Sequence, residues 1–256
     1  ITVVLRAFEN DSVPHPLKEV NPLRDLRTVL DSLVLADYEV AEKRLARLEK
    51  EAKRDGREYQ VLKTIVDRLG AGQLLGRGFF SAEDEKLFSG FAFLTAKPVV
   101  AVLNDGERPA DHAGVEDEAR SKGITVFTLR GDLEAEIAQL ETAEQAEFLK
   151  DLGASEPAKH RFLRTVYAHL DLVSFLTVGE DEVRAWSIRR GTTASRGSGT
   201  IHTDLEKGFI RAEVVRCDDL LACGDWAEAK KANKIRLEGR DYVLADGDVI
   251  LVRFNV

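Results

Sequence analysis

The chain has 256 residues, of which 44% are hydrophobic and 32% are charged, and its formal net charge is −8. This composition is that of an ordinary globular protein, and it excludes the disordered and collagen-like classes. No apolar run approaches the ~18 residues that cross a bilayer, and the opening residues ITVVLRAF lack the basic segment of a secretory signal.

Two residue types, Cys and Met, bear on the redox environment of the protein and on whether the sequence is part of a longer one. Cys217 and Cys223 have no His or Cys neighbour at metal-ligand spacing, so we expect reduced thiols in a cytoplasmic protein and no metal motif. The sequence contains no Met and begins at Ile1, inside a β-like apolar run. We therefore expect that an upstream part of the protein has been removed.

Charge is distributed unevenly along the chain. Residues 83–156 hold 7 basic and 17 acidic groups, which accounts for the net acidity. A basic cluster lies upstream and consists of Lys43, Arg44, Arg47, Lys50, Lys53, Arg54 and Arg57. Because Glu42, Glu49 and Glu51 are interleaved with it, a solvated helix face with i,i+4-type pairs is favoured over a patch that binds RNA.

In chain order, the first predicted elements are a strand and a helical hairpin. Residues 1–8 form a β-branched run typical of a buried strand. Asn21-Pro22 opens a helix whose apolar positions recur at steps of three and four for about seven turns. Asp55-Gly56 interrupts this pattern, and it resumes at 59–69. We predict two helices that fold back on each other, with a basic tip.

The middle of the chain alternates between helices and strands. Ser81, with Asp84 three residues on, caps a helix, and Lys97-Pro98 ends the helical region. The elements predicted next are a strand at 98–104, a helix at 111–122, a strand at 124–129 and one or two helices at 133–151. This alternation indicates an α/β fold with a mostly parallel sheet and ligands at the carboxyl ends of its strands.

After a helix at about 158–170, the pattern changes to short β-like segments separated by turns. The segments are 172–178, 182–188, 212–215, 242–244 and 249–254, with a helical stretch near 217–233. They indicate a separate small α+β domain. Gly191–Gly199 lacks the Lys and the glycine spacing of a phosphate-binding loop, so we predict a turn-rich loop there.

Two candidate sites in this C-terminal part are less favoured than ordinary structural roles. His202 and Asp204 are the residue types of a catalytic pair, but no Ser or Cys nucleophile accompanies them, which favours hydrogen bonding at a strand end. Trp186 and Phe209 could stack on RNA bases, as aromatic residues do beside arginines. Core packing is favoured for both, because each lies in an alternating strand-like run.

Asn104-Asp105-Gly106-Glu107, at the end of the second predicted strand, is the most informative candidate for a ligand site. At this point of the α/β alternation P-loop GTPases carry NKxD, in which Asn braces the loop and Asp accepts two N–H groups of guanine. Glu in the place of that Asp weakens guanine selectivity, whereas an Asn amide can pair with the N6/N7 edge of adenine. Taken alone, the tetrapeptide is more often a structural turn than a nucleotide site.

Longer motifs resemble a known family along essentially the whole chain. In the C-terminal part they are Glu182–Ile188, Ile201–Val214, Leu237–Tyr242 and Asp246–Val256. Upstream they are Phe8–Asp11, Asn21-Pro22, Leu35–Asp37, Phe93–Pro98 and the N-x-x-E at 104–107. In type and order these segments resemble the YchF/Obg-like ATPases, which are P-loop NTPases with a C-terminal TGS domain.

The resemblance implies an α/β architecture in three parts. These are an incomplete P-loop NTPase of the Obg-like G-domain type, a helical coiled-coil hairpin inserted in it, and a ubiquitin-like β-grasp TGS domain. Residues 1–21 and 96–171 would be the remainder of the nucleotide-binding G domain, 22–95 the hairpin and 172–256 the TGS domain. The P-loop, the switch segments and the Mg²⁺ ligands are expected upstream of residue 1, so we expect that the chain as given does not hydrolyse ATP.

The resemblance also implies a function and a set of site residues. The complete protein would be a cytoplasmic ATPase that binds ATP with Mg²⁺, with GTP less favoured, and associates with the large ribosomal subunit or ribosomal RNA and not with a membrane. Asn104, Asp105 and Glu107 inherit the base-binding role, and Gly131 alone fits the small-residue loop of the family. No catalytic residue or metal ligand is assigned within the chain. The alternative is a non-enzymatic ribosome- or RNA-binding module made of the hairpin and the TGS domain.

Overall fold

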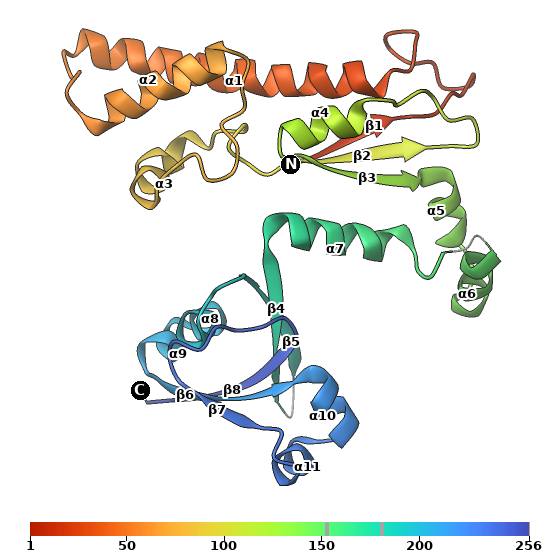
Figure 1. The fold of residues 1–256 in the computed structure, drawn as a ribbon, viewed down its shortest axis with the longest axis vertical. Coiled ribbons are helices and arrows are strands. Elements are labelled where there is room, and N and C mark those ends of the chain that lie inside the picture. Colours follow the sequence, from red (N-terminus) through yellow and green to blue (C-terminus); the bar gives the residue numbers. More distant parts are fainter. Residues whose placement is uncertain (152–153, 180–181, 256) are drawn as a thin grey trace. The chain divides into compact units, whose positions relative to one another are not determined.

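The computed structural model describes residues 1–151, 154–179 and 182–255. It divides the chain into two compact units, Ile1–Thr165 and Val166–Val256. Each unit contains its own β-sheet, one of three strands and one of five (Figure 1). Within the described residues, no helix is both long enough and apolar enough to cross a membrane.

Three parallel strands form the sheet of the first unit, in the order β1-β2-β3. They are β1 (Thr2–Arg6), β2 (Val100–Asp105) and β3 (Thr125–Arg130). The central strand β2 is buried from Val100 to Leu103, because both of its faces are covered, and this explains its continuous apolar run. The predicted parallel sheet is confirmed, and the carboxyl ends of its three strands lie along one edge.

Helices cover this sheet and form the hairpin. They are α1 (Pro22–Lys50), α2 (Arg57–Gly70), α3 (Ala82–Phe88), α4 (Val115–Ser121), α5 (Gly131–Ile137), α6 (Thr142–Asp151) and α7 (Ala158–Leu170), with a 3₁₀ turn at Ser89–Phe91. The helix predicted at 111–122 begins only at Val115. Its N-cap, Gly114, has a φ of 77°, a left-handed conformation that glycine adopts without strain.

The first half of α1 and the short helix α4 pack on one face of the sheet (Figure 1). The core between them consists of Val3, Leu5, Ala7, Leu26, Leu30, Val99, Ala101, Leu103, Val115, Ala119 and Ile124. On β3, Phe127 meets Phe162 of α7 edge-on, with ring centroids 5.4 Å apart. Burial on both faces therefore holds the strand ends in place, which is a condition for a preformed site at that edge.

The second half of α1 packs against α2, as the interrupted apolar pattern predicts. Leu48 of α1 is buried together with Leu62, Ile65 and Leu69 of α2. Arg44 binds Glu58 with two hydrogen bonds, of 2.6 and 2.9 Å, which join the two helices near their connection. The predicted helical hairpin is thus confirmed.

Ion pairs occupy more than half of the basic cluster near the hairpin tip. Arg44 pairs with Glu58 and Arg57 with Asp84. Lys53 and Arg47 both bond to Glu51, and together they lower the pKa of that carboxyl to about 2. Within the part of the chain that the structure describes, no ion pair involves the three remaining members, Lys43, Lys50 and Arg54. The i,i+4 pair of Arg47 and Glu51 agrees with the favoured interpretation of a solvated helix face.

Asp37 connects the hairpin to the segment that leads into β2. Its carboxylate is only 4% exposed and accepts three hydrogen bonds. Oδ1 accepts from Leu94 N (2.9 Å), and Oδ2 accepts from Thr95 N (2.7 Å) and Thr95 Oγ1 (2.6 Å). A carboxylate in this position satisfies two backbone N–H groups that would otherwise be buried without a partner.

Asn21 begins α1 as its N-cap. Its side-chain oxygen accepts a 3.0 Å hydrogen bond from Arg24 N. We expect Asn21→Ala to lower the free energy of unfolding by about 1 kcal/mol, because this N–H loses its partner. Asn21→Asp retains an acceptor and should leave stability nearly unchanged. Urea denaturation of both variants checks the prediction, which an equal loss in the two would contradict.

The second unit is built on a five-stranded sheet in the order β5-β4-β8-β6-β7. The strands are β4 (Leu172–Val178), β5 (Val183–Arg189), β6 (Phe209–Arg216), β7 (Arg236–Glu238) and β8 (Asp248–Phe254). β4 and β8 pair in parallel, whereas the other neighbours are antiparallel. Its other helices are α8 (Ala194–Ile201), α9 (Thr203–Lys207), α10 (Cys217–Cys223) and α11 (Trp226–Lys231).

Two predictions of secondary structure for this unit were wrong. The segment Gly191–Gly199 is not a loop throughout, since α8 begins at Ala194 and packs into the core. The absence of a side chain at Gly197 permits this packing, because a Cβ there would collide with the Leu244 side chain. Residues 242–244 do not form a strand. Only Val243 makes an isolated bridge, and the buried Asp248 carboxylate holds the segment through Tyr242 Oη and Ala245 N, each at 2.9 Å.

The weaker candidates of this unit take structural positions. His202 caps α9, not a strand end, since its Nδ1 accepts from Asp204 N at 3.2 Å. Phe209 is buried in the core, as predicted. Trp186 is half-buried against the same core, and its Nε1 donates to Thr177 Oγ1 while the Arg184 guanidinium covers its ring at 4.3 Å.

Candidate nucleotide-binding site

The site lies where the three parallel strands of the first unit end. The parallel register places Arg6 beside Asn104 and Asp105 beside Arg130. Beyond these residues the chain leaves the sheet and encloses a cavity of about 340 Å³. The cavity is lined by Phe8, Glu9, Asn10, Asn104, Asp105, Gly106, Glu107, Arg108 and Asp132. This is the edge at which α/β sheets bind ligands.

Asn104 braces the neighbouring loop. Its Oδ1 accepts a 2.9 Å hydrogen bond from the backbone N–H of Gly131, across from the end of β2 to the start of α5. A Cβ on Gly131 would lie 2.7 Å from this oxygen, so only glycine permits the contact without a shift. One of the two lone pairs of the amide oxygen is therefore engaged, and the second lone pair and Nδ2 are the groups that can bond a ligand.

A second close approach shapes the opposite wall of the cavity. A Cβ on Gly106 would lie 2.8 Å from Cβ of Phe8, so the turn after β2 packs directly on the second residue beyond β1. Asp105 stabilises this turn, because its Oδ1 accepts from Gly106 N at 2.9 Å. Phe8 is the one aromatic residue named in the lining of this cavity, and it supplies an apolar wall. Most of the charged side chains in the lining are carboxylates.

Arg130 forms an ion pair with Asp132, one of the acidic residues that line the cavity. Arg130 Nη2 donates to Asp132 Oδ2 at 3.2 Å. This bond raises the pKa of Arg130, and the charges of Glu107 and Asp105 act in the same direction. The same bond lowers the pKa of Asp132. Arg130 Nε is buried and has no hydrogen-bond partner among the described residues.

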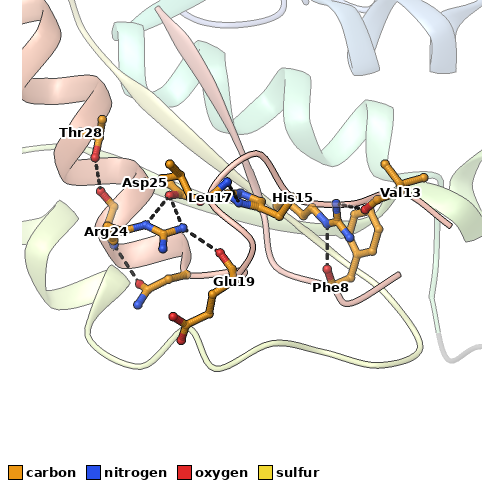
Figure 2. A network of polar contacts seen from close by, with 10 residues as sticks. Phe8, Val13, His15, Leu17, Glu19, Arg24, Asp25 and Thr28 are labelled. Atoms are coloured by element: carbon orange, nitrogen blue, oxygen red, sulfur yellow. Dashed lines mark hydrogen bonds and ion pairs between the residues drawn. The ribbon is translucent and has the colours of Figure 1, made fainter. Parts of the chain in front are cut away.

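The segment between β1 and α1 is anchored at both ends (Figure 2). Arg6 donates to the carbonyl oxygens of Phe8 (2.9 Å) and Val13 (2.6 Å). At the other end, His15 Nε2 and Arg24 both contact the Asp25 carboxylate, at 3.1 and 2.8 Å. These bonds hold the residues that follow Phe8 against the mouth of the cavity and tie them to the first turn of α1.

An extension of the sheet closes one side of the site. Ala7 N donates to Asn104 O at 2.8 Å and Glu9 N to Arg108 O at 3.0 Å, so the segments after β1 and β2 pair beyond the strand ends. The Arg108 side chain reaches back to Asp11 at 3.1 Å. Backbone hydrogen bonds therefore fix Glu9 and Arg108 at the rim of the cavity, although both lie outside the strands.

The structure brings together the residues singled out from the sequence. Asn104, Asp105 and Glu107 line the cavity, and Gly131 lies directly behind Asn104. Sequence reasoning did not assign Arg108 or Asp132, although they lie only four and three residues beyond the predicted strands 98–104 and 124–129. It also gave Phe8–Asn10 no role at the site. Their position just beyond the first strand is the feature of the sequence that could have indicated one. Their roles in binding a base stay predictions.

Comparison with known proteins identifies the chain. It is 39% identical to "Ribosome-binding ATPase YchF" of Bacillus subtilis, over 99% of this chain and 72% of that protein. The chain belongs to the YchF family. The protein of the same name from Pasteurella multocida is also 39% identical, with the same coverage. This agrees with the resemblance found in the sequence motifs.

A solved structure and a family model extend the YchF assignment. The structure of the Schizosaccharomyces pombe YchF GTPase matches with a TM-score of 0.82 and 28% identity, over 98% of this chain and 71% of that one. The model YchF-GTPase_C, described as a protein of unknown function (DUF933), matches residues 172–255. The mixed α/β fold of this YchF chain is therefore that of the solved family member.

Proposed function

We propose that the chain is part of a ribosome-associated nucleotide-binding protein and that the cavity at the ends of β1, β2 and β3 is its base-binding site. The observation that carries this proposal is the bond from Gly131 N to Asn104 Oδ1. It holds two strand-end loops together at the edge where a parallel sheet binds ligands. The names of the relatives, which are those of ribosome-binding ATPases, support the same function.

The lining of the cavity suits a purine base. Phe8 offers an apolar wall for a flat ring, and Asp105 and Glu107 offer carboxylate oxygens to its N–H groups. Asn104 Nδ2 is a donor for a ring nitrogen. In the complete protein we propose that ATP is bound and hydrolysed, with GTP less favoured, because Glu107 replaces the shorter carboxylate that holds guanine elsewhere.

The three-part division of the chain belongs to this proposal. Residues 1–21 and 96–171 would form the remainder of the G domain, with the hairpin at 22–95 inserted in it. Residues 172–256 would form a TGS domain of the ubiquitin-like β-grasp type. The central parallel pair β4-β8, flanked by antiparallel neighbours, supports this assignment, and so does the helix packing on the sheet.

The residues of this chain do not suit the binding of phosphate groups or of Mg²⁺. The 256 residues contain no GxxxxGK[ST] sequence. In the ranges 1–151, 154–179 and 182–255, no three His, Cys, Asp or Glu side chains are grouped so that they could hold a metal ion. We therefore propose that this chain supplies the base site and that the groups for phosphate and Mg²⁺ lie outside it.

Nucleotide binding by the 256-residue chain tests the proposal. We expect weak but saturable binding of ATP and no phosphate release above the buffer rate, measured by isothermal titration and a phosphate assay. Asn104→Ala should lower the affinity roughly tenfold, since the loop loses its brace. Glu116→Gln, on the exposed face of α4, is the control and should bind as the unaltered chain does. Absence of any nucleotide binding would overturn the assignment.

Ribosome association is tested separately, by co-sedimentation of the chain with ribosomes and with isolated large subunits. We propose a cytoplasmic partner of the large subunit or its RNA. The alternative of a non-enzymatic module receives no support from the relatives, whose names are those of ATPases. Failure to sediment with ribosomes, with or without ATP, would contradict the proposed partner while leaving the base site standing.

A further inference from the structure

We propose that Arg6 is a positioning residue of the base site, which holds the ring of Phe8 and the residues after it in the position that a purine base meets. This proposal rests on the proposed function, since it concerns the same cavity. Phe8, Glu9 and Asn10 line the cavity, whereas Arg6 lies behind them and is not part of the lining. Arg6 therefore acts on a bound base only through these neighbours.

The guanidinium of Arg6 binds three carbonyl oxygens of the segment that follows β1. Nε donates to Phe8 O at 2.9 Å and Nη1 to Val13 O at 2.6 Å (Figure 2). Nη2 donates to Asn10 O at 3.3 Å. Arginine can serve several acceptors at once because its five N–H groups form a rigid planar fork. These bonds fix the course of residues 8–13, which lie between β1 and α1 and belong to neither.

Arg6 also contacts the aromatic ring of Phe8. Its Cζ lies over this ring, 4.7 Å from the centroid. The face of an aromatic ring attracts a cation at this distance. Because Phe8 lines the cavity and Arg6 does not, the guanidinium covers the ring from outside the cavity and leaves the other face to a base.

The remaining contacts of Phe8 fix its backbone and its Cβ. Phe8 forms an isolated antiparallel bridge with Pro109. A Cβ added to Gly106 would lie 2.8 Å from Cβ of Phe8, so the backbone of the turn is close to the base of the side chain. In the part of the chain that the structure describes, no second aromatic ring packs on Phe8. The direction of the phenyl ring therefore depends on Arg6.

The Arg6 guanidinium is committed to the wall of the cavity. Within residues 1–151, 154–179 and 182–255 it forms no ion pair, whereas the nearby Arg108 and Arg24 bind the carboxylates of Asp11 and Asp25. Its hydrogen bonds go to Phe8, Asn10 and Val13. Loss of the side chain should therefore disturb this wall and not a distant part of the fold.

Titration of the 256-residue chain with AMP, followed by NMR, tests the inference. Amide chemical shifts give the affinity. The shifts of adenine H2 and H8, extrapolated to saturation, give the position of the base, because a phenyl ring moves the resonances of protons that lie over its face. Arg6→Met keeps much of the length without donors or charge, and we expect it to lower the affinity roughly tenfold. It should also reduce the H2 and H8 shifts, which a loss of stability alone would leave unchanged.

Arg68→Met is the matched control, because Arg68 makes the same kinds of contact elsewhere. Its Nε donates to the backbone oxygen of Leu74 at 2.8 Å, and its Cζ lies over the ring of Phe79 at 5.8 Å. Arg68 belongs to α2 and is not part of the cavity lining. We expect this variant to bind AMP with the affinity and the H2 and H8 shifts of the unaltered chain.

Arg6→Lys keeps the charge without the planar fork of donors, so it should recover only part of the affinity. Unchanged affinity and unchanged H2 and H8 shifts in Arg6→Met would overturn the inference and leave the base site standing, and so would equal losses in Arg6→Met and Arg68→Met. If thermal unfolding shows that Arg6→Met does not fold, full affinity in Arg6→Lys would overturn it instead. Failure of the unaltered chain to bind AMP would overturn the proposed function as well.

Discussion

Gly131→Ala is expected to lower the affinity of the chain for AMP at least about tenfold. The new Cβ would lie 2.7 Å from Oδ1 and 3.1 Å from Nδ2 of Asn104, so the Asn104 side chain must move. This movement breaks the 2.9 Å hydrogen bond from Gly131 N to Asn104 Oδ1, which joins the two loops of the base site. Titration by NMR measures the affinity, and thermal unfolding shows whether the fold survives.

Gly90→Ala is the matched control for this substitution. Gly90 has nothing within 4 Å of an added Cβ and no positive φ, so alanine fits there without displacement. We expect this variant to bind AMP as the unaltered chain does. If Gly131→Ala bound AMP with the same affinity as Gly90→Ala, the brace would have no part in binding. A loss confined to Gly131→Ala instead assigns the effect to the loop contact.

Asp37→Asn should lower the free energy of unfolding of the first unit by about 3 kcal/mol. The substitution conserves shape but replaces one carboxylate oxygen with an amide that donates. Leu94 N, Thr95 N and Thr95 Oγ1 all donate to this carboxylate, so at least one of them then faces another donor. Because the group is 4% exposed, water cannot replace the lost acceptor.

Urea denaturation followed by circular dichroism measures this loss. Asp31→Asn is the control on the same helix, since Asp31 is exposed and the same change of charge there should cost less than about 0.5 kcal/mol. A loss below about 1 kcal/mol for Asp37→Asn would show that the connection relaxes around the amide. The expected larger loss would show that Asp37 stabilises the connection between the hairpin and β2, the strand that contains Asn104.

Local patterns account for much of the first unit. The steps of three and four in α1 and α2 predict a hairpin because each helix has one apolar stripe that needs a partner. The apolar run of β2 predicts a central strand because both of its faces are covered. These patterns depend only on residues that are close in the sequence, so they can be recognised before any tertiary contact is known.

Other features depend on residues that are distant in the sequence. The stretch Gly191–Gly199 has the composition of a loop, yet α8 forms within it because Leu244 and Phe175 pack against the bare backbone of Gly197. In the same way, residues 242–244 have the pattern of a strand but are held by Asp248 instead. Long-range packing overrides local preference at both places.

The amino-acid sequence alone was enough to exclude a membrane-spanning run, to predict the α/β alternation and, through its long motifs, to place the chain in the YchF family. It also placed Asn104, Asp105, Glu107 and Gly131 at strand ends. The partners of these residues became known only from the three-dimensional structure. The Asn104 oxygen accepts a hydrogen bond from Gly131, 27 residues away, and the register of two strands sets Arg130 beside Asp105. Such contacts form through sheet pairing, so they cannot be deduced from spacing along the chain.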